Sequence, residues 1–118
     1  MLAHRNRMLT IVFVMLLLGI TGGCVSMCIG DAVYTSGTIV VPVTNTREPG
    51  DAYVQITVYQ LKNFEQQEFT VLNTPVTLRS GENRVIIPVN LEPGQYKLYI
   101  YLIRDGERQT AVIRDITV

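Results

Sequence analysis

The sequence contains no tryptophan, one histidine and two cysteines. The histidine, His4, lies in an N-terminal segment that is separate from the globular part, so the rest of the chain lacks the commonest general base and the commonest metal ligand. We therefore expect neither an enzyme nor a metal site. Both cysteines, Cys24 and Cys28, precede the strand-like part of the chain. No disulfide is expected across the core, whose stability must then come from packing.

The chain also lacks an excess of either charge. Ten basic and ten acidic residues balance, and because Arg5 and Arg7 lie in the leader, eight basic residues face ten acidic ones in the remainder. Nucleic-acid binding requires clustered lysine and arginine, so this class of partner is excluded. No Gly-x-Ser-x-Gly elbow and no Asp-x-Asp calcium motif occur. We expect no cofactor.

Acidic side chains leave one catalytic alternative, a hydrolase that works with paired carboxylates. The acids available to it are Glu65, Glu68, Glu92, Asp105, Glu107 and Asp115. Most of them lie in turns or between strand-like runs, where a solvated charge is the ordinary explanation. We rank this hydrolase as the least favoured function.

The N-terminal segment has the pattern of an export signal. Its first seven residues include His4, Arg5 and Arg7, and the apolar run 8–20 and three small residues follow before Cys24. A positive segment, an apolar segment and a small-residue cleavage site describe a secretory signal peptide. Basic residues before the apolar run stay on the cytoplasmic side, so the C-terminal part is exported. We expect a signal peptide at 1–23, a tether at 24–36 and one domain at 37–118.

The tetrapeptide Thr21-Gly22-Gly23-Cys24 resembles the lipobox of prokaryotic lipoproteins, although threonine stands where that family usually has leucine. The resemblance implies that Cys24 carries a lipid and becomes the new N-terminus, on the exported face of a membrane in the cell envelope. Two alternatives remain open. Residues 8–30 are uncharged and long enough to cross a hydrocarbon core of about 30 Å as an uncleaved anchor helix. Plain secretion is the other.

From Asp31 onward the apolar residues alternate with period two, which indicates strands that bury one face. The clearest runs are 53–61, 83–89 and 96–104. Their inward residues are expected to be Val54, Ile56 and Val58, then Val85, Ile87 and Val89, then Leu98, Ile100 and Leu102. Asp105-Gly106 favours a type I′ turn, so residues 95–104 should pair with 108–118 as a hairpin.

Further strands near 38–44, 68–72 and 75–79 bring the count to about seven. Because one sheet cannot hide its apolar face from water, we expect an all-β fold, a single immunoglobulin-like antiparallel β-sandwich behind the N-terminal hydrophobic segment. Pro42 lacks an N–H group, which indicates an edge strand or a bulge. Arg114 shares a face with Val112 and Ile116, so it either lies at a core position or requires a bulge.

The segment Leu91–Tyr96 resembles the tyrosine corner of immunoglobulin-like sandwiches, in which a buried tyrosine hydroxyl bonds to the backbone a few residues upstream. Four other segments, Val43-Thr44-Asn45, the strand 54–59, the segment 76–83 and Gly94–Leu98, together resemble the CARDB-type immunoglobulin-like modules of prokaryotic surface and secreted proteins. That resemblance covers about residues 37–102. It implies an adhesion, spacer or assembly role and names no ligand.

Four tyrosines, Tyr53, Tyr59, Tyr99 and Tyr101, lie on the outward side of two predicted strands. If these strands share a sheet, the rings form an apolar patch of the kind favoured at interfaces. The alternative is ordinary cross-strand pairing on an exposed sheet. The sequence thus predicts a membrane-anchored envelope lipoprotein with a non-catalytic binding or structural module and a possible protein partner. The runner-up is a subunit of a larger envelope assembly, such as a pilus or secretion complex, recruited by edge-strand pairing.

Overall fold

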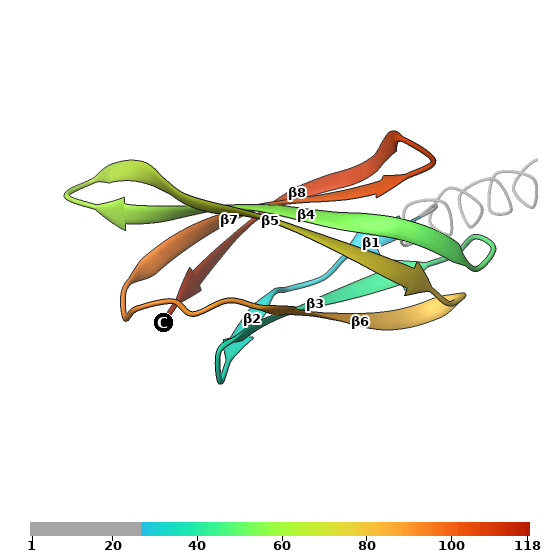
Figure 1. The fold of residues 1–118 in the computed structure, drawn as a ribbon, viewed down its shortest axis with the longest axis horizontal. Helices are drawn as coiled ribbons and strands as arrows, with labels where there is room; N and C mark the ends of the chain where they lie inside the picture. Colours follow the sequence, from blue (N-terminus) through green and yellow to red (C-terminus); the bar gives the residue numbers. More distant parts are fainter. Residues whose placement is uncertain (1–26) are drawn as a thin grey trace, which may run out of the picture.

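The computed structural model describes residues 27–118, which form eight antiparallel strands in two four-stranded sheets packed face to face (Figure 1). Sheet A contains β1 (Met27–Ile29), β2 (Val33–Thr35), β3 (Thr38–Asn45) and β6 (Gly81–Pro88). Sheet B contains β4 (Gly50–Lys62), β5 (Glu65–Leu78), β7 (Gln95–Arg104) and β8 (Glu107–Thr117). Within 27–118 no helix is long and apolar enough to span a membrane.

The core lies between the sheets, and the period-two pattern builds it. In sheet B the inward residues of β4 and β7 are completely buried, and in sheet A the inward residues of β3 and β6 face them. The predicted inward trios of β4 and β7 are confirmed. In the third trio Val85 and Ile87 are buried, and Val89 packs against the core from just beyond the end of β6. Because side chains alternate between faces, a slip of one residue would expose a whole trio.

The late hairpin is confirmed, since β7 pairs with β8 in antiparallel register and Arg104 lies opposite Glu107. Asp105 and Gly106 both have positive φ, at 54° and 74°, as a type I′ turn requires. The two strands predicted at 68–72 and 75–79 are one strand, β5. Pro75 is tolerated within it because β5 is an edge of sheet B.

Residues 27–35, predicted as part of a tether, belong to the sandwich. β1 pairs with Val43–Asn45 of β3, and β2 pairs with Thr38–Val40 of the same strand. The side chains of Met27 and Ile29 are buried in the core. The sandwich therefore includes residues before Gly37, and it has eight strands where we predicted about seven.

The expectation that Pro42 marks an edge strand or a bulge is wrong. It lies in β3, which has β6 on one side and both β1 and β2 on the other, in unbroken register with β6. The Pro42 carbonyl accepts a hydrogen bond from Gly30 N at 2.8 Å, so its missing N–H points to the same side. That side is the gap between β1 and β2. A proline is tolerated in a central strand because the strand beside it is interrupted there.

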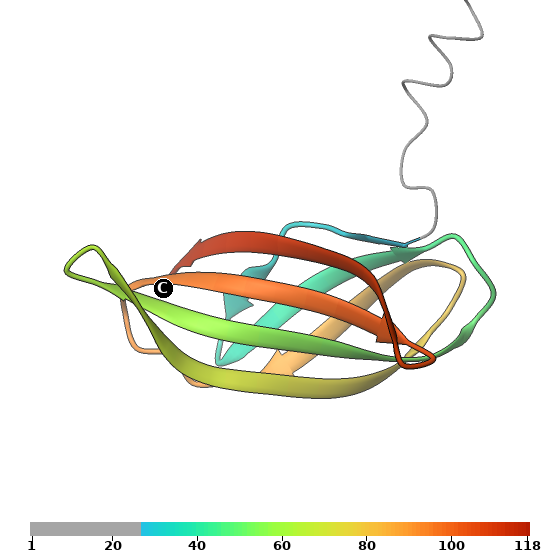
Figure 2. The same ribbon diagram turned by 90° about the horizontal axis from the view of Figure 1, so that it is seen from above.

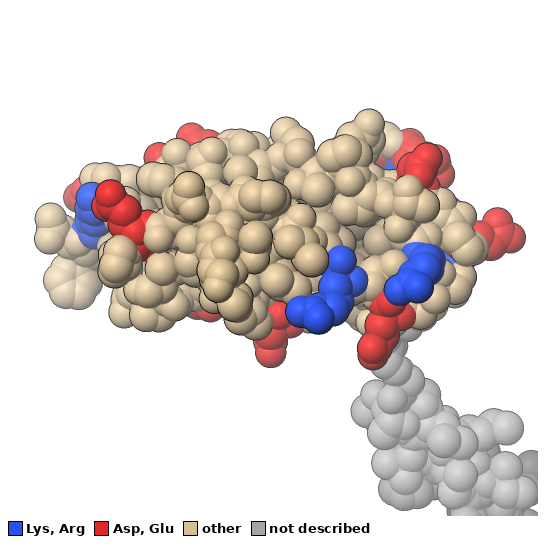
Figure 3. All heavy atoms as spheres, turned by 60° about the horizontal axis from the view of Figure 1, so that its bottom comes forward, with Lys and Arg blue, Asp and Glu red and all other residues tan. Residues whose placement is uncertain are grey.

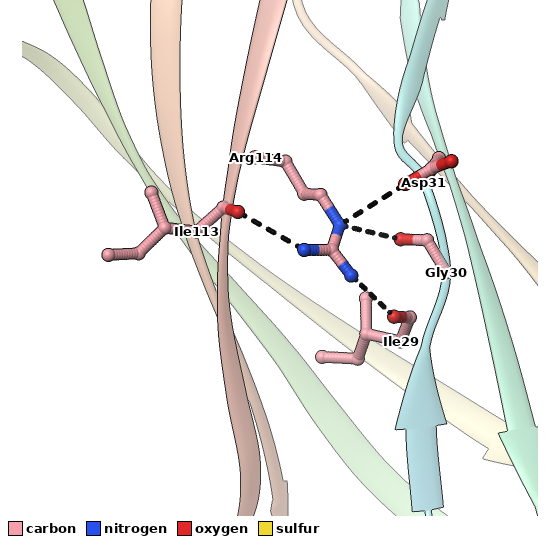
Figure 4. A network of polar contacts seen from close by, with 5 residues as sticks. All are labelled: Ile29, Gly30, Asp31, Ile113 and Arg114. Carbon is pink, nitrogen blue, oxygen red and sulfur yellow. Dashed lines mark hydrogen bonds and ion pairs between the residues drawn. The ribbon is translucent and has the colours of Figure 1, made fainter. Parts of the chain in front are cut away.

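The pairing of β8 with β7 has an irregularity that leaves Gln109 without a partner, and Arg114, opposite Leu98, lies on the inward face of β8 without entering the core (Figure 4). Its guanidinium reaches across to the end of β1, where Nη2 donates to the Ile29 carbonyl at 3.0 Å, and Nε donates to the carbonyl of the next residue, Gly30, at 3.2 Å. Nε also lies 3.6 Å from an Asp31 carboxylate oxygen. Because β8 is an edge strand, the long side chain can leave the interior and join the two sheets along their open side.

Tyr96 lies at the start of β7, as its second residue, and forms the predicted tyrosine corner, with its ring buried and its hydroxyl donating to the Glu92 carbonyl at 2.7 Å. An irregularity in the β4–β5 pairing leaves Phe69 of β5 without a partner across the ladder. The ring of this extra residue stands edge-on to Tyr96, with centroids 6.3 Å apart. The bulge thus places the Phe69 ring against Tyr96, at the end of the core that lies next to the β6–β7 loop.

Candidate interaction face

The four tyrosines singled out in the sequence lie on one surface, the outer face of sheet B. β4 and β7 are neighbours in this sheet, so Tyr53 is opposite Ile103 and Tyr101 is opposite Gln55. Tyr59 and Tyr99 are diagonal neighbours whose rings meet edge to face, with centroids 5.1 Å apart. Figure 2 views the molecule from this side, with β8, β7, β4 and β5 lying side by side.

The sheet extends this face with residues that the sequence reasoning missed. Val71 of β5 is opposite Thr57, and Ile113 of β8 is opposite Tyr99. Both are large exposed hydrophobic side chains. The signal for them was the alternation within β5 and β8, which runs at period two but has too few apolar residues to identify the outward face. We call this surface the tyrosine face, and it comprises Tyr53, Tyr59, Tyr99, Tyr101, Val71 and Ile113.

Charged side chains lie around the tyrosine face rather than within it. Near one end, Lys97 and Asp115 form an ion pair at 3.6 Å. Along β8, the Arg108 guanidinium carbon lies 4.3 Å from the centre of the Tyr101 ring, which is within the range of a cation–π attraction. Arg108 and Tyr101 also line a shallow hollow of about 470 Å³. The face is therefore mainly aromatic and aliphatic. The uncharged polar side chains of Gln55 and Thr57 lie among the rings, and the charged groups lie beside them.

A second hollow, of about 520 Å³, lies beside Tyr53 at the other end of the face. It is lined by Asp51 and Asp105, and Asp51 accepts a hydrogen bond from the Thr77 hydroxyl at 3.0 Å. Of the six acids considered for a hydrolase, one, Asp105, lines this hollow, in the turn between β7 and β8. In the described part of the chain no three His, Cys, Asp or Glu side chains gather as a metal site would need.

Of the two cysteines, Cys28 lies within the described residues and Cys24 does not. Cys24, the predicted lipid attachment point, lies outside the described residues, and so does the predicted signal peptide. Cys28 lies in β1, opposite Thr44, and is disulfide-bonded. The expectation that both cysteines precede the strands is therefore wrong for Cys28.

Comparison with known proteins supports the fold class. No family model matches the chain, and no curated protein matches it. Among solved structures it is similar to a crystal structure named "putative beta-galactosidase from bacteroides fragilis", with a TM-score of 0.51 and 18% sequence identity. The match covers 79% of this chain and 16% of that one, so the chain corresponds to a small part of a much longer protein. At this identity the likeness concerns the fold alone.

Proposed function

We propose that the chain is a membrane-anchored lipoprotein of the cell envelope whose immunoglobulin-like sandwich is a non-catalytic module that binds a protein partner through the tyrosine face. The observation that carries the proposal is the composition of that face. Four neighbouring strands contribute aromatic and aliphatic side chains to it, and the charged groups are at its margin. Interface cores have this composition, because they are enriched in tyrosine and depleted of charge, with a polar rim.

A protein partner fits the arrangement of the rings. Tyr59 and Tyr99 meet edge to face at an interplanar angle of 73°, and Tyr101 is covered by Arg108, so the rings form no flat platform. A partner surface with its own side chains can pack into such relief. Tyrosine also offers a large contact area at low cost in side-chain entropy, because it has two rotatable χ angles. The membrane anchor would raise the effective concentration of the module for neighbours on the same membrane.

Photo-crosslinking in intact cells tests the binding face. A photoreactive residue replaces Tyr101 in one variant and Val33, which is exposed on the outer face of sheet A, in the control. We expect an adduct of discrete mass at position 101 and none at position 33. Equal labelling at both positions, or no adduct at position 101, would refute the tyrosine face as the binding surface.

The anchor has a separate test. The chain holds two cysteines, and a sulfur that carries a lipid cannot also form a disulfide, so a lipid on Cys24 excludes a disulfide between Cys24 and Cys28 of the same chain. We expect intact mass spectrometry of the membrane-extracted protein to show a chain that begins at Cys24 and carries the added lipid. Cys24→Ser should release the protein from the membrane fraction, and Cys28→Ser is the matched control. A full-length chain without added lipid mass would disprove the lipid anchor.

A second candidate, a subunit of a larger envelope assembly that is joined by edge-strand pairing, is supported by a different observation. β6 is an edge of sheet A, and within residues 27–118 it pairs with β3 alone. This edge also leads to a more specific inference.

A further inference from the structure

The free edge of β6 displays an unbroken row of backbone hydrogen-bonding groups. Because the Pro42 carbonyl points to the β1–β2 side, the alternate residues Val41 and Val43 point their backbone groups to β6, where they are opposite Val85 and Asn83. The Val89 N–H to Gly37 carbonyl bond, at 3.0 Å, continues the same series. The remaining residues of β6, Glu82, Arg84 and Ile86, therefore direct their N–H and C=O groups away from β3.

The other long edges carry features that block an added strand. The edge of β5 is interrupted by Pro75 and by the bulge at Phe69. The edge of β8 lies beside the N-terminal strands, to which Arg114 binds it. Sandwich proteins normally protect their edges with prolines, bulges or covering segments, because an open edge recruits further strands. β6 has no bulge in its pairing with β3, and its only proline, Pro88, is its last residue.

The side chains that flank this edge carry complementary charges. Glu82, Arg84, Ile86 and Pro88 are all exposed on the outer face of sheet A. Figure 3 views the molecule from the side of sheet A, where uncharged side chains cover most of the surface and the few charged groups lie mainly near its margin. The structure gives Glu82 and Arg84 no ion pair with any of the described residues. Both charges are thus available to a partner at the edge.

We propose that β6 pairs with β6 of a second copy of this chain, antiparallel across a two-fold axis at Asn83. In this register each Glu82 lies opposite Arg84 of the other copy, which forms two ion pairs on the outer face. Residues 82 and 84 both point their backbone groups outward, so the same contacts form four backbone hydrogen bonds. Shifting the register by two residues places Arg84 opposite itself, and like charges directly opposite are unfavourable. A further shift places it opposite Ile86, and no ion pair forms.

The proposal does not depend on the tyrosine face, which belongs to the other sheet, or on the nature of the anchor. The contact is small and would give a weak, reversible dimer in free solution. Confinement of both copies to one surface would favour it. Two copies joined in this way would share one continuous sheet and leave both tyrosine faces open to partners.

Charge reversal tests the pairing in the full-length protein. Two differently tagged copies are co-expressed, crosslinked in intact membranes and extracted in detergent, and the capture of one tag with the other is measured. We expect the native copies to be captured together. Glu82→Arg alone places two arginines opposite each other, and Arg84→Glu alone does the same with two glutamates, so each should reduce self-capture about tenfold. Glu65→Arg, at the tip of the β4–β5 hairpin, is the matched control and should change nothing.

The two defective variants should rescue each other. When Glu82→Arg carries one tag and Arg84→Glu carries the other, each residue 82 faces a residue 84 of opposite charge in the mixed dimer. The double variant, with both substitutions in one chain, gives the same opposite-charge pairs when it pairs with itself. Recovery of capture in these two cases would also show that the single variants are folded. Absence of native capture, retention of capture by both single variants, or loss without mutual rescue would each overturn the proposal. Membrane fractionation of the same extracts reports on the anchor independently.

Discussion

At the scale of single residues, Tyr96 is the buried group whose ionisation should be visible in stability. Burial raises the pKa of its hydroxyl above the usual 10.0, and the negative charge of Glu92 raises it further. Below about pH 10 the hydroxyl is protonated in both the folded and the unfolded chain, so it adds no pH dependence. Above that pH the unfolded chain releases a proton that the folded chain retains, and stability falls as the pH rises.

Tyr96→Phe therefore has two expected effects. Loss of the hydrogen bond to the Glu92 carbonyl should lower the free energy of unfolding at pH 7 by about 0.5–1.5 kcal/mol. The stability of the variant should also decline less steeply than that of the native protein above pH 10. Urea unfolding between pH 7 and 11 measures both effects, with Tyr53→Phe, 56% exposed, as the control. Parallel alkaline profiles for the native protein and Tyr96→Phe would contradict this account.

Residue types also set how much of the candidate site could be predicted. Tyr53, Tyr59, Tyr99 and Tyr101 were found because tyrosine is conspicuous on the polar side of an alternating strand, and the structure brings all four to one face. Arg114 could not be placed, because its partners are the backbone carbonyls of Ile29 and Gly30. Carbonyls are present at every residue, so no sequence pattern identifies those that an arginine will bind.

At the scale of elements, strands with three inward aliphatic residues were predictable and short strands were not. β4 and β7 carry complete trios, whereas β1 and β2 have three residues each and show no period. The dipeptide Ser36-Gly37 was a usable sequence signal for β2, because glycine is favoured in two-residue hairpin turns. In the structure both residues have positive φ, at 49° and 79°, as such a turn requires. The turn between β4 and β5 carried a weak signal, because it uses Asn63 and Phe64, without glycine, at positive φ.

The gap between β1 and β2 yields a prediction about how a central strand accommodates proline. A Cβ atom on Gly30 would lie 2.9 Å from Pro42 Cγ, closer than side chains normally approach. Gly30→Ala should therefore destabilise the sandwich by about 1–3 kcal/mol, the usual cost of overpacking. In a Pro42→Ala background the ring is gone and the same substitution should cost clearly less.

A double-mutant cycle by urea unfolding measures this coupling, because the two residues are in direct contact. Gly106→Ala is a useful comparison, since a Cβ there would meet no atom within 4 Å and any cost would come from the positive φ of 74°. That cost should be the same in the native and the Pro42→Ala backgrounds. Equal costs of Gly30→Ala in the two backgrounds would show that the proline ring does not require the glycine.

At the scale of the whole molecule, the N-terminal strands decide where the folding unit begins. We expected a domain from Gly37, but Met27 and Ile29 are core residues and the Tyr34 hydroxyl accepts a hydrogen bond from Leu91 N at 3.1 Å. The same segment supplies the carbonyls that bind Arg114. It therefore contacts both sheets, although its backbone pairs only with β3 of sheet A.

Chains that begin at Met27 and at Gly37 should consequently differ sharply in stability. Removing the buried side chains of Met27 and Ile29 should lower the free energy of unfolding by roughly 3–6 kcal/mol, at about 1.5–3 kcal/mol each. Arg114 also loses its hydrogen-bond acceptors. Since small domains are stable by only about 5–15 kcal/mol, the shorter chain should be marginal or unfolded at 37 °C. Thermal unfolding followed by circular dichroism compares the two chains. Because Arg114 binds the removed segment, Arg114→Met should destabilise the longer chain and have little effect on any folded form of the shorter one. Equal melting temperatures would mean that the sandwich closes without its first two strands.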